Sequence, residues 1–138
     1  LDKPIIVGFS ILELSKVLMY DFHYNTMKPR YGDNLKLLFT DTDSLCYEIT
    51  TEDVYQDMKQ NQNSYDFSEY PQTHPLFSAE NKKIIGKFKD ETNGTPIHEF
   101  VGLRSKLYSF KLFDAEKNKM AETKKVKRCE EKCGQETR

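Results

Sequence analysis

The chain has no tryptophan, only three cysteines and almost no net charge. A small, odd number of cysteines argues against a disulfide framework and favours a reducing, intracellular setting. No stretch of about 18 apolar residues exists that would predict a membrane span. The N-terminus lacks the basic segment and apolar run of a signal peptide. A formal net charge of −1 gives no general indication of nucleic-acid binding.

The 138 residues are 37% hydrophobic and 31% charged. This composition predicts one ordinary domain with a modest core, or a piece of a larger protein, and the first residue, Leu1, favours the piece. Acidic residues gather at 41–57 and 66–69, whereas lysines gather at 82–89 and 117–128. Such a distribution suits an enzyme that holds a metal ion beside a polyanion, but lysine runs are equally typical of a solvated surface.

Residues 10–25 are predicted to form a helix. Ser10 and Glu13 have the spacing of a capping box at its start. Apolar residues then recur three and four positions apart, which predicts one buried face formed by Ile11, Leu14, Leu18 and Phe22, widened by Val17. Pro29 and Gly32 are expected to end the helix.

Two strands are expected at residues 34–40 and 44–50, joined at a tip formed by Asp41, Thr42 and Asp43. In the second strand, Leu45, Tyr47 and Ile49 should share one face. The rest of the pattern predicts a short helix at 51–59, a loop at 61–78, and strands at 83–89, 97–103 and 106–112, with a hairpin turn at residues 93–94. The fold class is therefore expected to be α+β, with helices packed on an antiparallel sheet.

The tip of the first hairpin carries two carboxylates one residue apart, Asp41 and Asp43. Two carboxylates at the tip of a hairpin can bind divalent cations, and two-metal phosphoryl or nucleotidyl transfer needs such a site. The alternative is a turn in which the aspartates bond only their own backbone.

Residues 39–44 (Phe-Thr-Asp-Thr-Asp-Ser) resemble motif C of family B DNA polymerases, Tyr-x-Asp-Thr-Asp-Ser, with Phe39 in the tyrosine position. Residues 102–108 (Gly-Leu-Arg-Ser-Lys-Leu-Tyr) resemble the Lys-x-Tyr motif that follows motif C in that family. The sequence at residues 12–16, 86–91 and 99–103 is similar to sequences of the protein-primed branch of this family. That branch includes polymerases of Polinton or Maverick transposons and related viruses. The resemblance covers about residues 3–112. It implies that 1–112 is the C-terminal part of a palm subdomain and that 113–138 is a polar, lysine-rich tail, disordered or beginning a thumb.

The resemblance also implies roles for individual residues. Asp43 would bind the catalytic Mg²⁺ and Asp41 would support the site, while Lys106 and Tyr108 would contact the DNA. The side chains that support the motif C turn would be Phe39, Thr42 and Ser44. The implied partners are primer–template DNA, deoxynucleoside triphosphates and a terminal priming protein, with no membrane partner. A nuclear location follows by analogy if the source is an integrated eukaryotic element. From spacing alone, Lys106 and Tyr108 also fit an ordinary strand with one face outward.

The family's motif A, which supplies the other metal-binding aspartate, and its motif B have no match in this sequence. We therefore expect the 138-residue chain to be inactive as a polymerase by itself. One alternative is a non-catalytic, truncated or decayed transposon or viral remnant that binds DNA weakly or not at all. A further alternative is an unrelated magnesium-dependent nuclease or phosphatase, which would require additional clustered carboxylates.

Overall fold

The computed structural model describes residues 4–104, 106–114 and 119–126. The chain divides into two compact units, residues 1–96 and 97–138. The fold is a mixture of helices and antiparallel sheets, which confirms the expected α+β class. One short parallel strand pair adds to it.

The first unit begins with a long helical segment. Helix α1 (Ile5–Asp21) continues through a π-helical stretch, η1 (Phe22–Met27), into α2 (Lys28–Tyr31). Pro29 does not end the helix as predicted, because it lies in the first turn of α2, a position where a helix tolerates proline. The helix ends at Gly32, whose φ of +53° suits glycine.

The capping box that was predicted at Ser10 and Glu13 is wrong, because the helix starts five residues earlier, at Ile5. The Ser10 hydroxyl donates to the carbonyl of Ile6 at 2.9 Å, a common bond for serine inside a helix. Glu13 forms an ion pair with Lys16.

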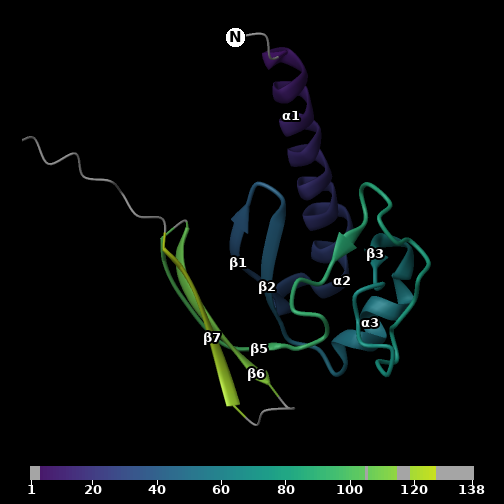
Figure 1. The fold of residues 1–138 in the computed structure, drawn as a ribbon, viewed down its shortest axis with the longest axis vertical. Coiled ribbons are helices and arrows are strands. Elements are labelled where there is room, and N and C mark those ends of the chain that lie inside the picture. Colours follow the sequence, from purple (N-terminus) through teal and green to yellow (C-terminus); the bar gives the residue numbers. More distant parts are fainter. Residues whose placement is uncertain (1–3, 105, 115–118, 127–138) are drawn as a thin grey trace, which may run out of the picture. The chain divides into compact units, whose positions relative to one another are not determined.

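Most of the apolar stripe on α1 is not part of a core in this structure. Of the predicted stripe, Phe22 is buried at 7% exposure. The other members are exposed: Ile11, Leu14, Val17 and Leu18. The spacing correctly identified an apolar helix, but burial depends on what lies beside it, and the N-terminal part of α1 extends away from the rest of its unit (Figure 1).

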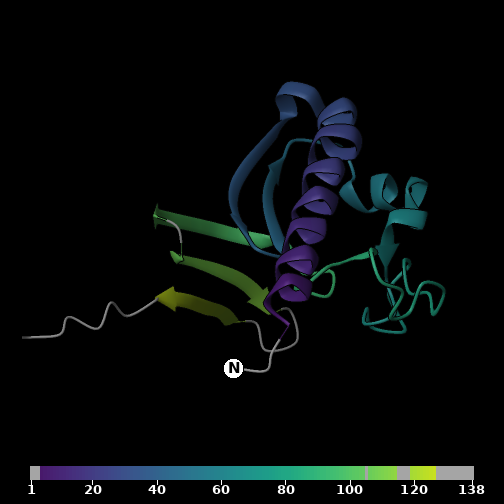
Figure 2. The same ribbon diagram turned by 90° about the horizontal axis from the view of Figure 1, so that it is seen from above.

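The hairpin follows as predicted. Strand β1 (Leu35–Asp41) pairs antiparallel with β2 (Ser44–Ile49). The short helix η2 (Gly32–Asn34) leads into β1. The hairpin lies beside the C-terminal part of the helical segment (Figures 1 and 2), where a core forms from Phe22, Met27 and Leu35 with Leu45, Tyr47, Ile49, Tyr31, Tyr65 and Phe88. The shared face of Leu45, Tyr47 and Ile49 is thus confirmed.

The second half of this unit contains helix α3 (Val54–Gln60), a short helix η3 (Gln62–Ser64) and a parallel pair, β3 (Tyr65–Asp66) with β4 (Phe88–Lys89). Helix α3 matches the predicted helix at 51–59, and Asp53 caps it by accepting from two backbone N–H groups. The predicted strand at 83–89 shrinks to two residues because Lys83 and Gly86 take positive φ angles. The turn at 93–94 exists but does not join a hairpin, since β4 pairs with β3.

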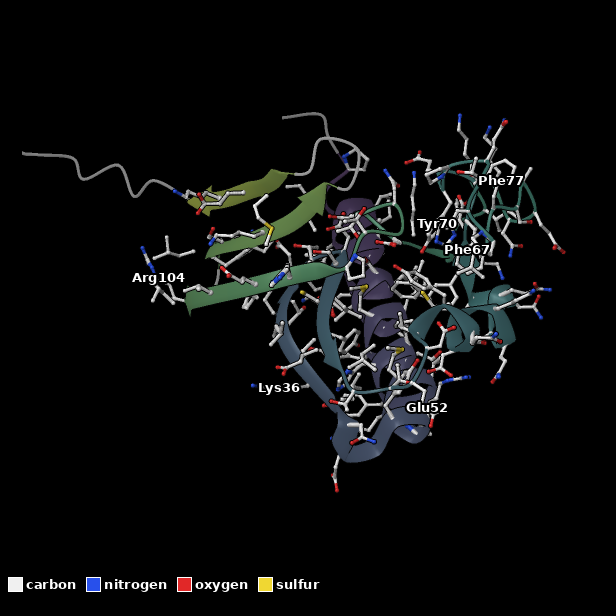
Figure 3. All side chains as sticks on the ribbon, turned by 90° about the horizontal axis from the view of Figure 1, so that it is seen from below. Lys36, Glu52, Phe67, Tyr70, Phe77 and Arg104 are labelled. Atoms are coloured by element: carbon white, nitrogen blue, oxygen red, sulfur yellow. The ribbon has the colours of Figure 1, made fainter. Side chains whose placement is uncertain are left out.

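Two aspartates organise the long loop that connects β3 with β4 and the turn that follows it. Asp66 accepts from the backbone N–H groups of Ser68 and Lys83. Asp90 accepts from the Tyr70 hydroxyl and from the Gly94 N–H, both at 2.8 Å. Inside the loop, a second core contains Phe67, Tyr70 and Leu76; Phe67 and Tyr70 lie together, and Phe77 is more exposed (Figure 3). Aspartates therefore replace regular secondary structure in holding this segment.

The second unit is a three-stranded antiparallel sheet of β5 (Ile97–Arg104), β6 (Leu107–Asp114) and β7 (Lys119–Val126). The first two strands confirm the predicted strands at 97–103 and 106–112. Strand β7 was missed, because residues 113–138 were expected to be a polar tail. Its Glu122 lies opposite Lys111, which in turn lies opposite Glu99 and bonds it at 2.7 Å. The rest of the predicted tail, 115–118 and 127–138, lies outside the described residues, and the proposed boundary at residue 112 stays a prediction.

Candidate functional site

The tip of the β1–β2 hairpin is a two-residue turn formed by Thr42 and Asp43. The last strand pair before it joins Asp41 to Ser44. The Asp41 carboxylate accepts from the backbone N–H of Thr42 at 2.9 Å, a bond that suits aspartate as the first residue of a turn. Asp41 is half-buried, whereas Thr42 and Asp43 are exposed. The tip thus presents carboxylate oxygen to solvent on a short, tight turn.

A bulge in β1 decides which face of the hairpin Asp41 occupies. The register shifts between Leu37, which pairs with Tyr47, and Phe39, which pairs with Cys46. Paired residues point to the same side of a sheet, so Leu37 shares the core face and Phe39 shares the opposite one. Without the bulge, residues 37, 39 and 41 would lie on one face of the strand, and Asp41 would share the core face with Leu37. The bulge therefore moves Phe39 and Asp41 to the side of Cys46 and Ser44, opposite the face that packs on Phe22 and Met27.

A polar contact ties the hairpin to the helix. Nδ1 of His23, in the π-helical stretch, lies 2.9 Å from the hydroxyl of Tyr47 on β2. The two rings are parallel within 1°, with centroids 5.7 Å apart. Burial, assisted by the neighbouring Tyr65, raises the pKa of Tyr47 to about 12, so the phenol keeps its proton at neutral pH. A π-helical turn is rare in proteins and often occurs near functional sites.

The hairpin tip supplies only part of a metal site. Within the described residues, no group of three or more His, Cys, Asp or Glu side chains is placed to hold a metal ion. Magnesium is bound by oxygen ligands in octahedral geometry and keeps several waters, so exposed carboxylates fit its chemistry. The fit is incomplete, because Asp41 and Asp43 would have to be joined by further ligands.

The predicted DNA-contacting residues lie in the second unit. Lys106 directly precedes β6 and is exposed, with a φ of +60°. A lysine in the left-handed region is uncommon, and such conformations cluster at functional sites. Lys106 was predicted inside the strand, but β6 begins one residue later, at Leu107.

Tyr108 is 7% exposed and packs beside two rings, those of Phe100 at 6.0 Å and Phe110 at 6.4 Å. Its cross-strand partner is Gly102. A Cβ at Gly102 would come within 2.9 Å of the Phe100 ring, so glycine allows these rings to pack closely. In this structure Tyr108 is a packing residue of its sheet, and its contact with DNA stays a prediction.

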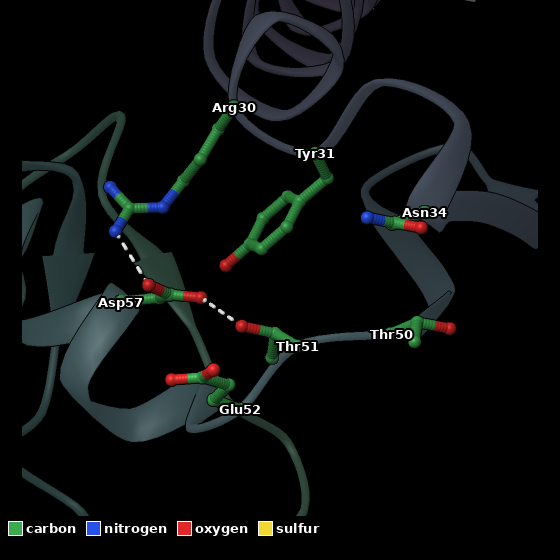
Figure 4. A pocket seen from close by; sticks show the side chains of 7 residues that line it. All are labelled: Arg30, Tyr31, Asn34, Thr50, Thr51, Glu52 and Asp57. Carbon is green, nitrogen blue, oxygen red and sulfur yellow. Dashed lines mark hydrogen bonds and ion pairs between the residues drawn. The ribbon is translucent and has the colours of Figure 1, made fainter.

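Sequence reasoning missed an open polar pocket of about 640 Å³ in the first unit, shown in Figure 4, whose lining residues are Arg30, Tyr31, Asn34, Thr50, Thr51, Glu52 and Asp57. Asp57 receives hydrogen bonds from Arg30 at 2.7 Å and Thr51 at 2.8 Å. The bond from Arg30, followed by that from Thr51, holds the pKa of Asp57 below its usual value. These bonds join α2, the segment after β2 and α3. The ion pair could not be predicted from local sequence because Arg30 and Asp57 lie 27 residues apart.

Comparison of the chain with protein-family models, curated proteins and solved structures gives no match. The described helices include none with the length and apolar character needed to cross a membrane. The family resemblance of residues 39–44 and 102–108 therefore stays a prediction, to be judged by experiment.

Proposed function

We propose that this chain is part of the palm of a family B DNA polymerase of the protein-primed type. The observation that carries the proposal is local. The Asp-Thr-Asp-Ser sequence lies at the two-residue tip of an antiparallel hairpin, and a bulge turns Asp41 away from the core. A hairpin with this sequence at its tip is the arrangement that the resemblance to motif C leads one to expect.

In the proposed reaction, the 3′-hydroxyl of a DNA primer attacks the α-phosphate of a deoxynucleoside triphosphate and pyrophosphate leaves. Asp43, which is exposed, would be the main magnesium ligand, and the half-buried Asp41 would support the turn and the primer end. Bound magnesium would lower the pKa of the attacking hydroxyl and stabilise the charge that develops on the phosphate. Lys106 would contact a backbone phosphate, a contact that positions DNA without reading its sequence.

The 138-residue chain is proposed to be inactive on its own, because motifs A and B have no match in it. A terminal priming protein and a nuclear location belong to the same proposal and rest on the resemblance alone.

Primer extension tests the proposal. The 138-residue chain should add no nucleotides to a primed template above its Asp43→Ala variant. A longer protein, encoded with in-frame motifs A and B upstream, should extend the primer, and Asp43→Ala in that protein should lower the rate by about a thousandfold or more, because it removes a ligand of the catalytic metal. Equal extension by the longer protein and its Asp43→Ala variant would exclude the polymerase role for this hairpin.

The second candidate is a non-catalytic remnant of such a polymerase. It is favoured by the missing motifs and by the incomplete carboxylate set among the described residues. Stop codons upstream of residue 1 in the source DNA would establish the remnant, whereas in-frame motifs A and B would exclude it.

A further inference from the structure

The loop before β4 carries two exposed isoleucines at its tip. Ile84 is 52% exposed and Ile85 is 100% exposed. They follow Lys82 and Lys83 directly in the sequence. We refer to these four residues, 82–85, as the Lys-Ile tip. Several other large apolar side chains are exposed in this structure, and what distinguishes Ile84 and Ile85 is the pair of lysines directly before them.

The tip is held in place from both sides. The Asn81 side chain donates to the carbonyl of Tyr65 at 3.0 Å, and the Lys83 N–H donates to the Asp66 carboxylate at 3.1 Å. On the other side, the Lys87 ammonium donates to the carbonyl of Asn63. Three positive φ angles, at residues 81, 83 and 86, set the direction of the chain through the tip. The isoleucines are thus presented by an anchored loop.

The tip itself carries the two positive charges of Lys82 and Lys83. Residues 78–89 contain four lysines and one carboxylate, Glu80, and the carboxylates of Asp90 and Glu91 follow directly. Lys89 pairs with Glu69, and Lys87 is bonded to a carbonyl. Within the part of the chain that the structure describes, neither Lys82 nor Lys83 forms an ion pair, and both are exposed. Two cations beside two apolar side chains are complementary to a polyanion that also offers apolar surface.

We infer that the Lys-Ile tip is a docking surface for double-stranded DNA. Lys82 and Lys83 contact backbone phosphates, and Ile84 and Ile85 contact the apolar sugar and base surface of the minor groove, where DNA-binding proteins commonly insert isoleucine. This inference rests on the proposed function, because polymerase activity makes DNA the polyanion. An anionic lipid surface is the competing partner, since polybasic segments also bind it.

Fluorescence anisotropy with a labelled DNA duplex, repeated over a series of salt concentrations, tests the inference. The variant Lys82→Gln/Lys83→Gln should weaken binding and lower the slope of log K against log salt by about 2, because each phosphate contact contributes about 0.9. The variant Ile84→Ser/Ile85→Ser should weaken binding about tenfold while leaving the slope unchanged, because it removes apolar contacts only.

Matched controls separate the tip from general charge and exposure. Lys28→Gln/Lys59→Gln removes the same charge from two other exposed lysines. Ile5→Ser/Ile6→Ser removes isoleucines that are 75% and 81% exposed on α1. Both controls should bind DNA within about twofold of the unmodified chain. For the lysine control, long-range charge effects are largely screened at physiological salt. The isoleucine control changes no charge and leaves the Lys-Ile tip intact.

The outcomes distinguish the inference from the proposed function when Lys106→Ala is measured alongside. If the tip variants bind as the unmodified chain does and Lys106→Ala binds more weakly, the tip is not a DNA surface and the polymerase proposal stands. If the tip variants bind weakly and Lys106→Ala has no effect, the tip binds DNA but the proposed role of Lys106 fails. Binding to phosphatidylserine vesicles but not to the duplex, lost in Ile84→Ser/Ile85→Ser, would overturn the inference in favour of a lipid surface. Binding to neither would overturn it outright.

Discussion

Replacing Phe22 with alanine tests how the helical segment is attached to the hairpin. Phe22 is 7% exposed, its ring stacks on that of Phe88 with centroids 3.9 Å apart, and it meets the edge of Tyr65 at 5.9 Å. With Met27, it is one of two buried residues of η1 in the core that also contains Leu35 at the start of β1. Removing a buried phenylalanine side chain costs about 3–5 kcal/mol, since both the apolar contacts and the filled volume are lost.

Urea denaturation followed by circular dichroism measures this cost. With an m value of about 2 kcal/mol/M, Phe22→Ala should lower the midpoint by about 1.5–2.5 M. Phe9→Ala is the matched control, because Phe9 lies on α1 and is 63% exposed. Its effect should stay within about 0.5 kcal/mol. If Phe22→Ala is too unstable to fold, Phe22→Leu keeps much of the volume and should show a smaller loss of the same sign.

If Phe22→Ala changed the free energy of unfolding by less than about 1 kcal/mol, Phe22 would not hold the helix to the hairpin, since buried aromatic truncations cost more than that. If Phe9→Ala cost as much as Phe22→Ala, the exposed part of α1 would be packed in solution.

Three further predictions concern single polar or titratable side chains. Asp90→Asn should lower the free energy of unfolding by about 1–3 kcal/mol, because Asp90 accepts from the Tyr70 hydroxyl and backbone N–H groups; an unchanged urea midpoint would contradict this. The Arg30 hydrogen bond lowers the pKa of Asp57 in the folded state, so its stabilisation is present above the unfolded pKa of about 3.9 and disappears as the pH falls through the lower folded value. Asp57→Asn should therefore lose less stability than the unmodified chain on acidification below about pH 4, and equal losses in urea titrations would show that the carboxylate is not paired. Burial raises the pKa of the Cys46 thiol to about 11, so iodoacetamide at neutral pH should modify Cys46 only after unfolding, as peptide mass spectrometry would reveal; rapid labelling of the folded chain would place this thiol at the surface.

The parts of the fold that local sequence determines were predicted well. The hairpin at Asp41 and Asp43 follows from alternation in β2 and from turn-forming residues at its tip, both of which are short-range properties. The bulge in β1 could not be predicted, because register is set by the partner strand. Its consequence, the placement of Asp41 on the face away from the core, was therefore also missed.

Where the predictions failed, non-local contacts or backbone strain decided the outcome. The helix begins within Ile5-Ile6-Val7, a β-branched run that disfavours a helical start. Burial of Leu14 could not be judged from spacing, because spacing does not say whether a partner covers the face. Strand β7 was not predicted, because its lysines are typical of a solvated tail. In the structure, Glu122 on β7 lies opposite Lys111 on β6. Because Lys83 has a positive φ, the strand predicted at 83–89 is shortened to the two residues of β4.

Manganese(II) titration tests whether the tip of the Asp41–Asp43 hairpin binds a metal ion, as proposed. Manganese(II) occupies oxygen-ligand sites of the magnesium type and broadens NMR signals of nearby nuclei, so titration of the ¹⁵N-labelled chain locates it even when binding is weak. We expect the amide signals of Thr42 and Asp43 to broaden first, and Asp43→Asn to abolish this effect whereas Asp33→Asn, at another exposed aspartate, does not. Early broadening elsewhere in the chain, or an unchanged effect in Asp43→Asn, would show that the tip is not the metal site.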